Sequence, residues 1–152
     1  MPNPHPVLVH FPIALLTLAV LFELAAKLAK SEVLSRVGWW NQLTGTLGLA
    51  AAVLSGLAAE RSVTIGGAAR PYVDTHEQLA FIASAVFAVL LLWRIANRSR
   101  IPDRSALVYL LLLAVGAFFL WGTAWFGGEI VYRFGVGITT VTQEAQPVRL
   151  PL

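Results

Sequence analysis

The segment HPVLVHFPIALL, residues 5–16, places two of the three histidines of the chain at the entrance of a long apolar run. Ionisable side chains are costly where a helix enters a membrane, so those that occur there are candidates for function. The third histidine, His76, begins another apolar run. The pattern therefore predicts a site at a membrane surface, provided that the two runs are membrane helices that begin on the same side.

The composition predicts an integral membrane protein. Hydrophobic residues make up 57% of the 152 positions and charged residues 12%, and the mean hydropathy is +0.72, outside the range of soluble domains. Four apolar runs are each close to the ~20 residues that cross ~30 Å of hydrocarbon. They cover about residues 10–30, 38–59, 76–96 and 105–126. Because the links are short, we expect one all-α membrane domain over residues 1–152, an up-down bundle of four transmembrane helices.

Local signals refine this expectation. Thr75 and Ser105 are predicted to cap the third and fourth helices, and Glu23 is predicted to pair with Lys27 one turn later. Residues 127–152 are too polar and too rich in glycine to span a membrane. They predict a short extended or hairpin-like tail on the outer face.

The basic residues predict the orientation. Seven of the eleven Lys and Arg residues lie in or beside the first and third links. The positive-inside rule then places both termini and the loop at residues 60–75 outside the cytoplasm. Because these basic residues flank membrane segments, the net charge of +3 does not indicate a nucleic-acid partner.

With this orientation, His5, His10 and His76 all lie at the outer face, and three chemistries are open to them. The first is haem b held by the imidazoles of His10 and His76, with small residues below each histidine leaving room for the macrocycle. Arg61 and Arg133 would pair with its propionates, and Tyr132 lies beside them on the same side. His5 is an alternative ligand if the chain before His10 bends, because five residues correspond to about 140° around a helix.

The second chemistry is a Zn(II) or Cu(II) site at His10 and His76, completed by a carboxylate such as Glu77 or Glu129. The third is a histidine that simply titrates in a proton-linked or quinone-like site. Against all three stands the plainer interpretation that interfacial histidines only anchor or cap helices. The absence of cysteine excludes disulfides, iron–sulfur ligation and covalent c-type haem.

Three motifs carry a resemblance to a known family: HPVLVHFPIALL, the His76-Glu77 pair, and GGEIVYRFGVG at residues 127–137. Together they resemble a bacterial family of predicted four-helix membrane proteins, a domain of unknown function, over nearly the whole chain. The family pattern falls on His5, Pro6, His10, Phe11, Pro12, His76, Gly127, Gly128, Tyr132, Gly135 and Gly137. Some relatives are joined to Rieske-type iron–sulfur domains, which implies electron transfer and favours haem over a bare metal ion.

The sequence thus predicts a multi-pass protein of the bacterial inner membrane that binds haem b and transfers electrons, rather than a stand-alone enzyme. Its partners would be the lipid bilayer and a separate redox protein, either as a homo-oligomer or as a subunit of a membrane complex. The rival hypotheses are a Zn- or Cu-binding membrane protein and a structural or assembly subunit without a cofactor.

Overall fold

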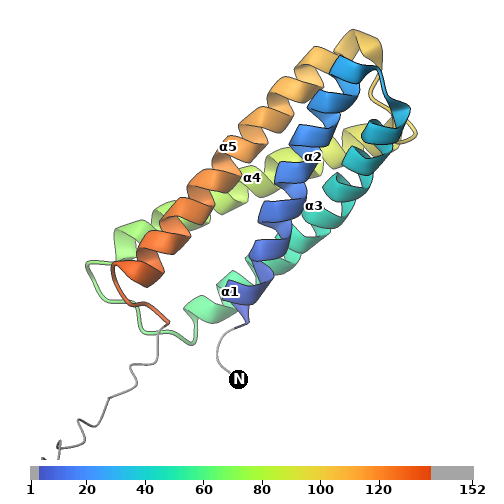
Figure 1. Cartoon of the computed structure of the whole chain (residues 1–152). Coiled ribbons are helices and arrows are strands. Elements are labelled where there is room, and N and C mark those ends of the chain that lie inside the picture. Colours follow the sequence, from blue (N-terminus) through green and yellow to red (C-terminus); the bar gives the residue numbers. More distant parts are fainter. Residues whose placement is uncertain (1–3, 138–152) are drawn as a thin grey trace, which may run out of the picture.

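The structure is a computed structural model that describes residues 4–137, and this part of the chain is helical, with no strand. Its elements are α1 (His5–Leu8), α2 (His10–Ala29), α3 (Glu32–Glu60), α4 (Arg70–Ala96), the 3-10 turn η1 (Asp103–Ser105) and α5 (Ala106–Tyr132) (Figure 1). Four segments in the described range are long and apolar enough to cross a membrane. The predicted all-α membrane fold is confirmed.

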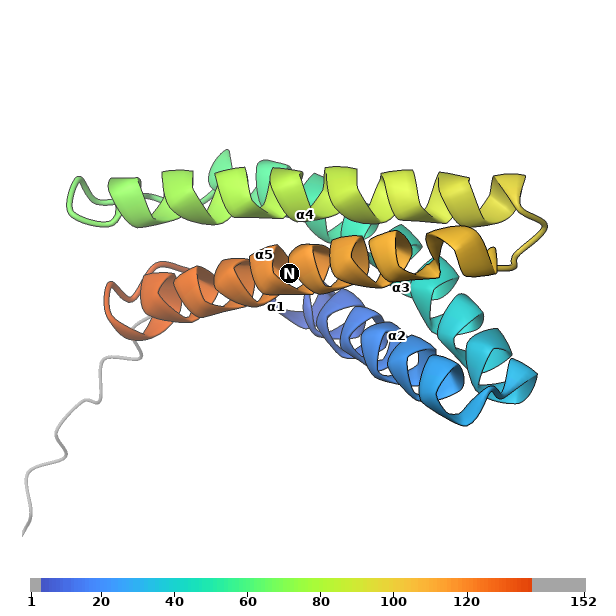
Figure 2. The ribbon, with the colours of Figure 1, turned by 90° about the horizontal axis from the view of Figure 1, so that it is seen from above.

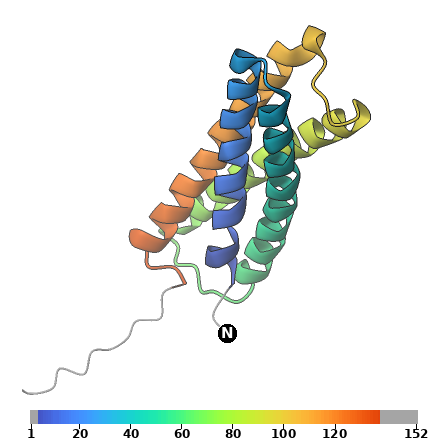
Figure 3. The same ribbon diagram turned by 45° about the vertical axis from the view of Figure 1, so that its right-hand side comes forward.

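The helices form an up-down bundle of two hairpins, α2 with α3 and α4 with α5. Each helix packs against its neighbours in chain order, and α5 closes the bundle against α2. The beginning of α1, the α3–α4 link and the end of α5 lie at one end, while the other two links lie at the opposite end (Figures 1 and 3). Viewed from above, the two hairpins cross at an angle (Figure 2). Helices α2 and α4 therefore face each other across the centre of the bundle, as do α3 and α5.

Helices α1 and α2 form one interrupted segment. Proline has no N–H to donate, so Pro12 leaves the helical hydrogen bond to the carbonyl of Leu8 unmade. The helix breaks at Val9, although Val9 keeps helical dihedral angles and its N–H bonds to the carbonyl oxygen of His5 at 3.1 Å. The predicted bend before His10 is thus a local break, and His5 remains helical.

Three helices extend beyond their predicted apolar runs, and the first of them, α3, begins at Glu32, six residues before the predicted start at residue 38. Helix α4 begins at Arg70, six residues before His76, with Pro71 in its first turn, where a missing N–H costs little. Thr75 is therefore inside the helix and not a cap; its hydroxyl donates to the carbonyl of Pro71 at 2.8 Å. Helix α5 continues through Gly127 and Gly128 to Tyr132, so the predicted extended tail does not begin at residue 127. Residues 138–152 lie outside the described part.

The bundle interior consists of apolar side chains from all four long helices. Leu16, Phe87, Leu90 and Leu113 are fully buried, whereas Leu107 and Phe118 of α5 are 70% and 71% exposed. Large apolar side chains on the outside are expected when lipid surrounds the helices. The core leaves polar groups at its two ends, the histidines at one and Glu23 with Arg94 at the other.

Candidate functional site

A cavity of about 570 Å³ opens at the end of the bundle where α1 begins, between residues of all five α-helices. All three histidines line it, as do Glu60, Glu77 and Tyr132. Its remaining wall is largely apolar and includes Pro12, Ile13, Leu49, Val53, Ala80 and Leu120. The predicted convergence of the three histidines on one space at one end of the bundle is therefore present.

Within the cavity, His5 and His76 are the two rings that meet. Their centroids lie 6.3 Å apart and their planes are nearly perpendicular, at 89°. His10 lines the same cavity but is exposed. The sequence predicts His10 and His76 as the ligand pair, with His5 as an alternative ligand. In the structure, His5 is the histidine whose ring lies next to that of His76.

Each of the two rings is held by a backbone carbonyl. The Nδ1 atom of His5 lies 3.0 Å from the carbonyl oxygen of Ala52 in α3, and also 3.0 Å from the hydroxyl of Ser55. The Nδ1 atom of His76 lies 2.8 Å from the carbonyl oxygen of Thr123 in α5. A carbonyl only accepts, so each Nδ1 carries the proton and each Nε2 carries the lone pair. Histidines that bind metals through Nε2 have this tautomer, with Nδ1–H held by a carbonyl oxygen.

Glycines form the surfaces on which the two rings rest. A Cβ added at Gly56 would lie 3.0 Å from Cε1 of His5, and one added at Gly127 would lie 3.2 Å from Cε1 of His76. Each glycine follows, by one helical turn, the residue whose carbonyl holds the ring. Absence of a side chain at these two positions lets the imidazoles lie against the helix backbone.

The predicted propionate partners, Arg61 and Arg133, directly follow the cavity-lining residues Glu60 and Tyr132 in the sequence. Arg61 is exposed. Arg133 donates to the hydroxyl of Tyr72 at 3.0 Å and pairs with Glu129 at 3.5 Å. Tyr132 lines the cavity but is 91% exposed. Neither arginine is among the residues that line the cavity, whereas Tyr132 is.

A bare-metal site receives less support. Zn(II) is almost always held by four ligands, at least three of them from the protein. Over residues 4–137, no group of three or more His, Cys, Asp or Glu side chains is placed to hold a metal ion. Glu129 is paired with Arg133, and Glu60 accepts from Arg70 at 2.7 Å.

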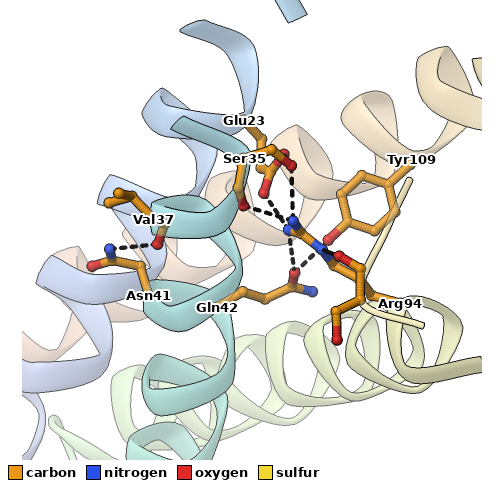
Figure 4. A network of polar contacts seen from close by, with 8 residues as sticks. Glu23, Ser35, Val37, Asn41, Gln42, Arg94 and Tyr109 are labelled. Atoms are coloured by element: carbon orange, nitrogen blue, oxygen red, sulfur yellow. Dashed lines mark hydrogen bonds and ion pairs between the residues drawn. The ribbon is translucent and has the colours of Figure 1, made fainter. Parts of the chain in front are cut away.

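The opposite end of the bundle contains a buried ion pair that the sequence interpretation missed. Glu23 of α2 pairs with Arg94 of α4, and the two side chains are 2% and 1% exposed. Arg94 also donates to the carbonyl and hydroxyl oxygens of Ser35, at 2.7 and 3.0 Å, and to the carbonyl of Ser99 at 3.1 Å. Figure 4 shows the guanidinium among these groups and Gln42, whose side-chain oxygen also accepts from Tyr109.

The expected pairing of Glu23 with Lys27 is therefore wrong, since Lys27 pairs with Asp103 at 3.0 Å. The i, i+4 rule considers only partners on one helix. A charge in the middle of an apolar run is the signal that could have indicated a partner on another helix.

The fold and the cavity define a class, that of four-helix membrane proteins with histidines gathered at one end. The chain belongs to the family described as predicted membrane protein (DUF2231), whose model matches residues 2–140. This confirms the predicted membership of such a family. No curated protein and no solved structure matches the chain.

Proposed function

We propose that this membrane protein binds one haem b between His5 and His76 and transfers electrons at the outer surface of the membrane. The observation that carries the proposal is the pair of carbonyl-anchored imidazoles, one from each hairpin, that meet in one cavity. Haem supplies one-electron redox chemistry when bound. The chain would bind it, orient it and keep water from it.

The dimensions support this choice. The centroids of the two imidazole rings lie 6.3 Å apart, so both rings would reach one group bound between them. The cavity of about 570 Å³ lies within the range of about 300–1,000 Å³ that is usual for cofactor sites. Its apolar wall suits the macrocycle.

The donor set distinguishes haem from a bare ion. Two imidazoles complete the coordination of an iron whose four other ligands come from the porphyrin. A bare Zn(II) would require more protein ligands. The family resemblance described in the sequence analysis, which implies iron–sulfur domains in some relatives, also favours electron transfer, and here the redox partner would be a separate protein.

We further propose the orientation given by the basic residues: a bacterial inner-membrane protein with both termini and the histidine cavity outside the cytoplasm. Arg61 and Arg133, each next in sequence to a cavity-lining residue, would then bind the propionates where they reach water. Removing either arginine should weaken haem retention without changing the axial ligands.

The test is the visible spectrum of the purified full-length protein. Two imidazole ligands predict a six-coordinate, low-spin haem whose bands sharpen on reduction without added ligand. His5→Ala and His76→Ala should each abolish that spectrum or make it five-coordinate. Phe118→Ala, on the lipid-facing side of α5, is the matched control and should leave it unchanged.

Other outcomes identify the rivals. A colourless protein that takes up Zn(II) or Cu(II) stoichiometrically would contradict the haem proposal and favour the metal-binding alternative. A protein that binds neither haem nor metal would be a structural or assembly subunit whose histidines serve packing.

A further inference from the structure

The two histidine sites repeat at a fixed interval. His5 and His76 are 71 positions apart, as are Ala52 and Thr123, whose carbonyls hold them. Gly56 and Gly127, on which the rings rest, are also 71 positions apart. Each imidazole–carbonyl contact therefore spans the same 47 positions. The histidines, the residues whose carbonyls hold them and the supporting glycines share one interval, which indicates a repeated unit.

The same interval relates the buried faces of the helices. Four buried residues of α2 each lie 71 positions before a buried residue of α4. Five buried residues of α3 each lie 71 positions before a buried residue of α5. The first set pairs Pro12 with Ala83, Leu16 with Phe87, Ala19 with Leu90, and Glu23 with Arg94. The second pairs Gly38 with Tyr109, Gln42 with Leu113, Gly45 with Gly116, Leu49 with Leu120, and Ala52 with Thr123.

Individual packing contacts repeat as well. A Cβ at Gly45 would lie 2.8 Å from Leu16, and one at Gly116 would lie 3.2 Å from Phe87. Leu16 and Phe87 are themselves an equivalent pair. The contact of α2 with α5 has its counterpart in that of α3 with α4. The correspondence thus includes packing within and between the hairpins.

We propose that the chain is a tandem repeat of one helical hairpin, with an interval of 71 residues, and that its ligand binds on the pseudo-twofold axis between the hairpins. Both hairpins begin at the same end of the bundle, so this axis runs along the bundle, as in parallel repeats of transporters. His5 and His76 are then equivalent ligands. The ligand part of this inference rests on the proposed function; the repeat does not.

The repeat also explains why His10 is set apart from the other two histidines. Its counterpart, 71 positions later, is Phe81, so no second imidazole stands in the equivalent place.

The buried ion pair fits the same axis. In two identical hairpins the equivalents of Glu23 and Arg94 would be like charges facing each other, whereas the present chain has opposite charges there.

Equivalence is tested first at the ligand. Gly56→Ala and Gly127→Ala press on the two rings from equivalent positions and should give spectral and haem-retention losses of similar size. His5→Ala and His76→Ala should likewise match each other, while His10→Ala and Phe81→Ala should keep six-coordinate haem. If His10→Ala loses six-coordinate haem while His5→Ala keeps it, the ligand does not bind on the pseudo-twofold axis.

A circular permutant tests the repeat without any ligand. The proposed axis relates Arg61 to Tyr132 and His76 to His5. The gap between Tyr132 and His5 is therefore expected to be as wide as the gap between Arg61 and His76. Fourteen residues, 62–75, connect Arg61 to His76. Twenty-four residues, 133–152 followed by 1–4, are available to connect Tyr132 to His5. The permutant joins Leu152 directly to Met1 and opens the chain between Gly66 and Gly67. It contains every residue of the protein with the hairpins in reverse order.

We expect this permutant to be monodisperse in detergent, with a thermal midpoint within a few degrees of that of the parent chain. The control has the same Leu152–Met1 join but opens between Arg100 and Ile101, which divides the second hairpin, and it should lose the fold. If both permutants are equally unstable, the repeat is overturned. If the parent is colourless while the first permutant is stable, the haem proposal fails and the repeat stands.

Discussion

At the scale of single residues, Arg94 determines how the end of the bundle opposite the histidine cavity is held together. Its guanidinium ties together α4, the carboxylate of Glu23 on α2 and the backbone of Ser35 on α3. A Cβ at Gly38 would lie 2.4 Å from the carboxylate oxygen of Glu23, so the absence of a side chain there makes room for the pair. Within residues 4–137, only Nε2 of Gln42 is left as a buried side-chain donor without a partner.

Arg94→Met tests this arrangement because it keeps length and apolar volume but leaves the carboxylate of Glu23 buried and unpaired. Removing one member of a buried pair typically costs about 3–5 kcal/mol, so we expect a loss of that size in unfolding free energy in detergent. The double variant Glu23→Leu/Arg94→Met should recover most of it, since no charge then remains buried. A single variant as stable as the parent would show that the pair does not hold the bundle.

Gly38→Ala provides an independent measurement at the same site. The added methyl group would collide with the carboxylate that Arg94 binds, and overpacking typically costs about 1–3 kcal/mol. Chemical denaturation of the detergent-solubilised protein measures the loss. Gly66→Ala, in the α3–α4 link with open space around its Cβ, is the control and should change stability little.

At the scale of the elements, close approach of α2 and α3 depends on small residues at defined positions. Gly45→Ala places a methyl group 2.8 Å from the side chain of Leu16, whereas at Gly48 the nearest atom, Cδ of Pro12, is 3.5 Å away. We therefore expect Gly45→Ala to lower stability by about 1–3 kcal/mol and Gly48→Ala to be nearly neutral. Equal effects on the thermal midpoint would mean that the two helices are not packed as described.

The elements also show what sequence alone could predict. Hydropathy placed four helices because lipid immersion leaves long apolar runs, but it could not place their ends. Helix α4 begins at Arg70 and helix α5 ends at Tyr132, because backbone hydrogen bonds continue after the apolar pattern stops. The interval of 71 between His5 and His76 was visible in the sequence. It acquires meaning only when α2 and α4 are seen to face each other across the bundle, because that arrangement brings the two rings together.

At the scale of the whole molecule, the proposed orientation places the histidine cavity outside and Arg94 at the cytoplasmic end. A reporter that is active only in the cytoplasm, fused to Leu152, should therefore give no signal, and the same reporter inserted after Arg100 should be active. The seven-to-four distribution of Lys and Arg provides the reason. The reverse pattern of signals would invert the topology.

The pseudo-twofold axis makes a second prediction at this scale. An axis along the bundle that exchanges two axial ligands must lie in the plane of the haem between them. The haem should therefore stand upright, with its plane close to the membrane normal. Linear dichroism of oriented bilayers measures this angle. A haem lying flat in the membrane would contradict a haem position on the pseudo-twofold axis.

The ion pair across the two hairpins has a consequence for how the protein is made. Arg94 follows Glu23 by 71 positions, which at about 5–20 residues per second takes roughly 4–14 s of synthesis. During that time the first hairpin holds the carboxyl group of Glu23 in or near lipid without its partner, which is unfavourable. A nascent chain stalled in the α3–α4 link would therefore carry an unpaired carboxyl group, and we expect it to be degraded faster than the full-length protein.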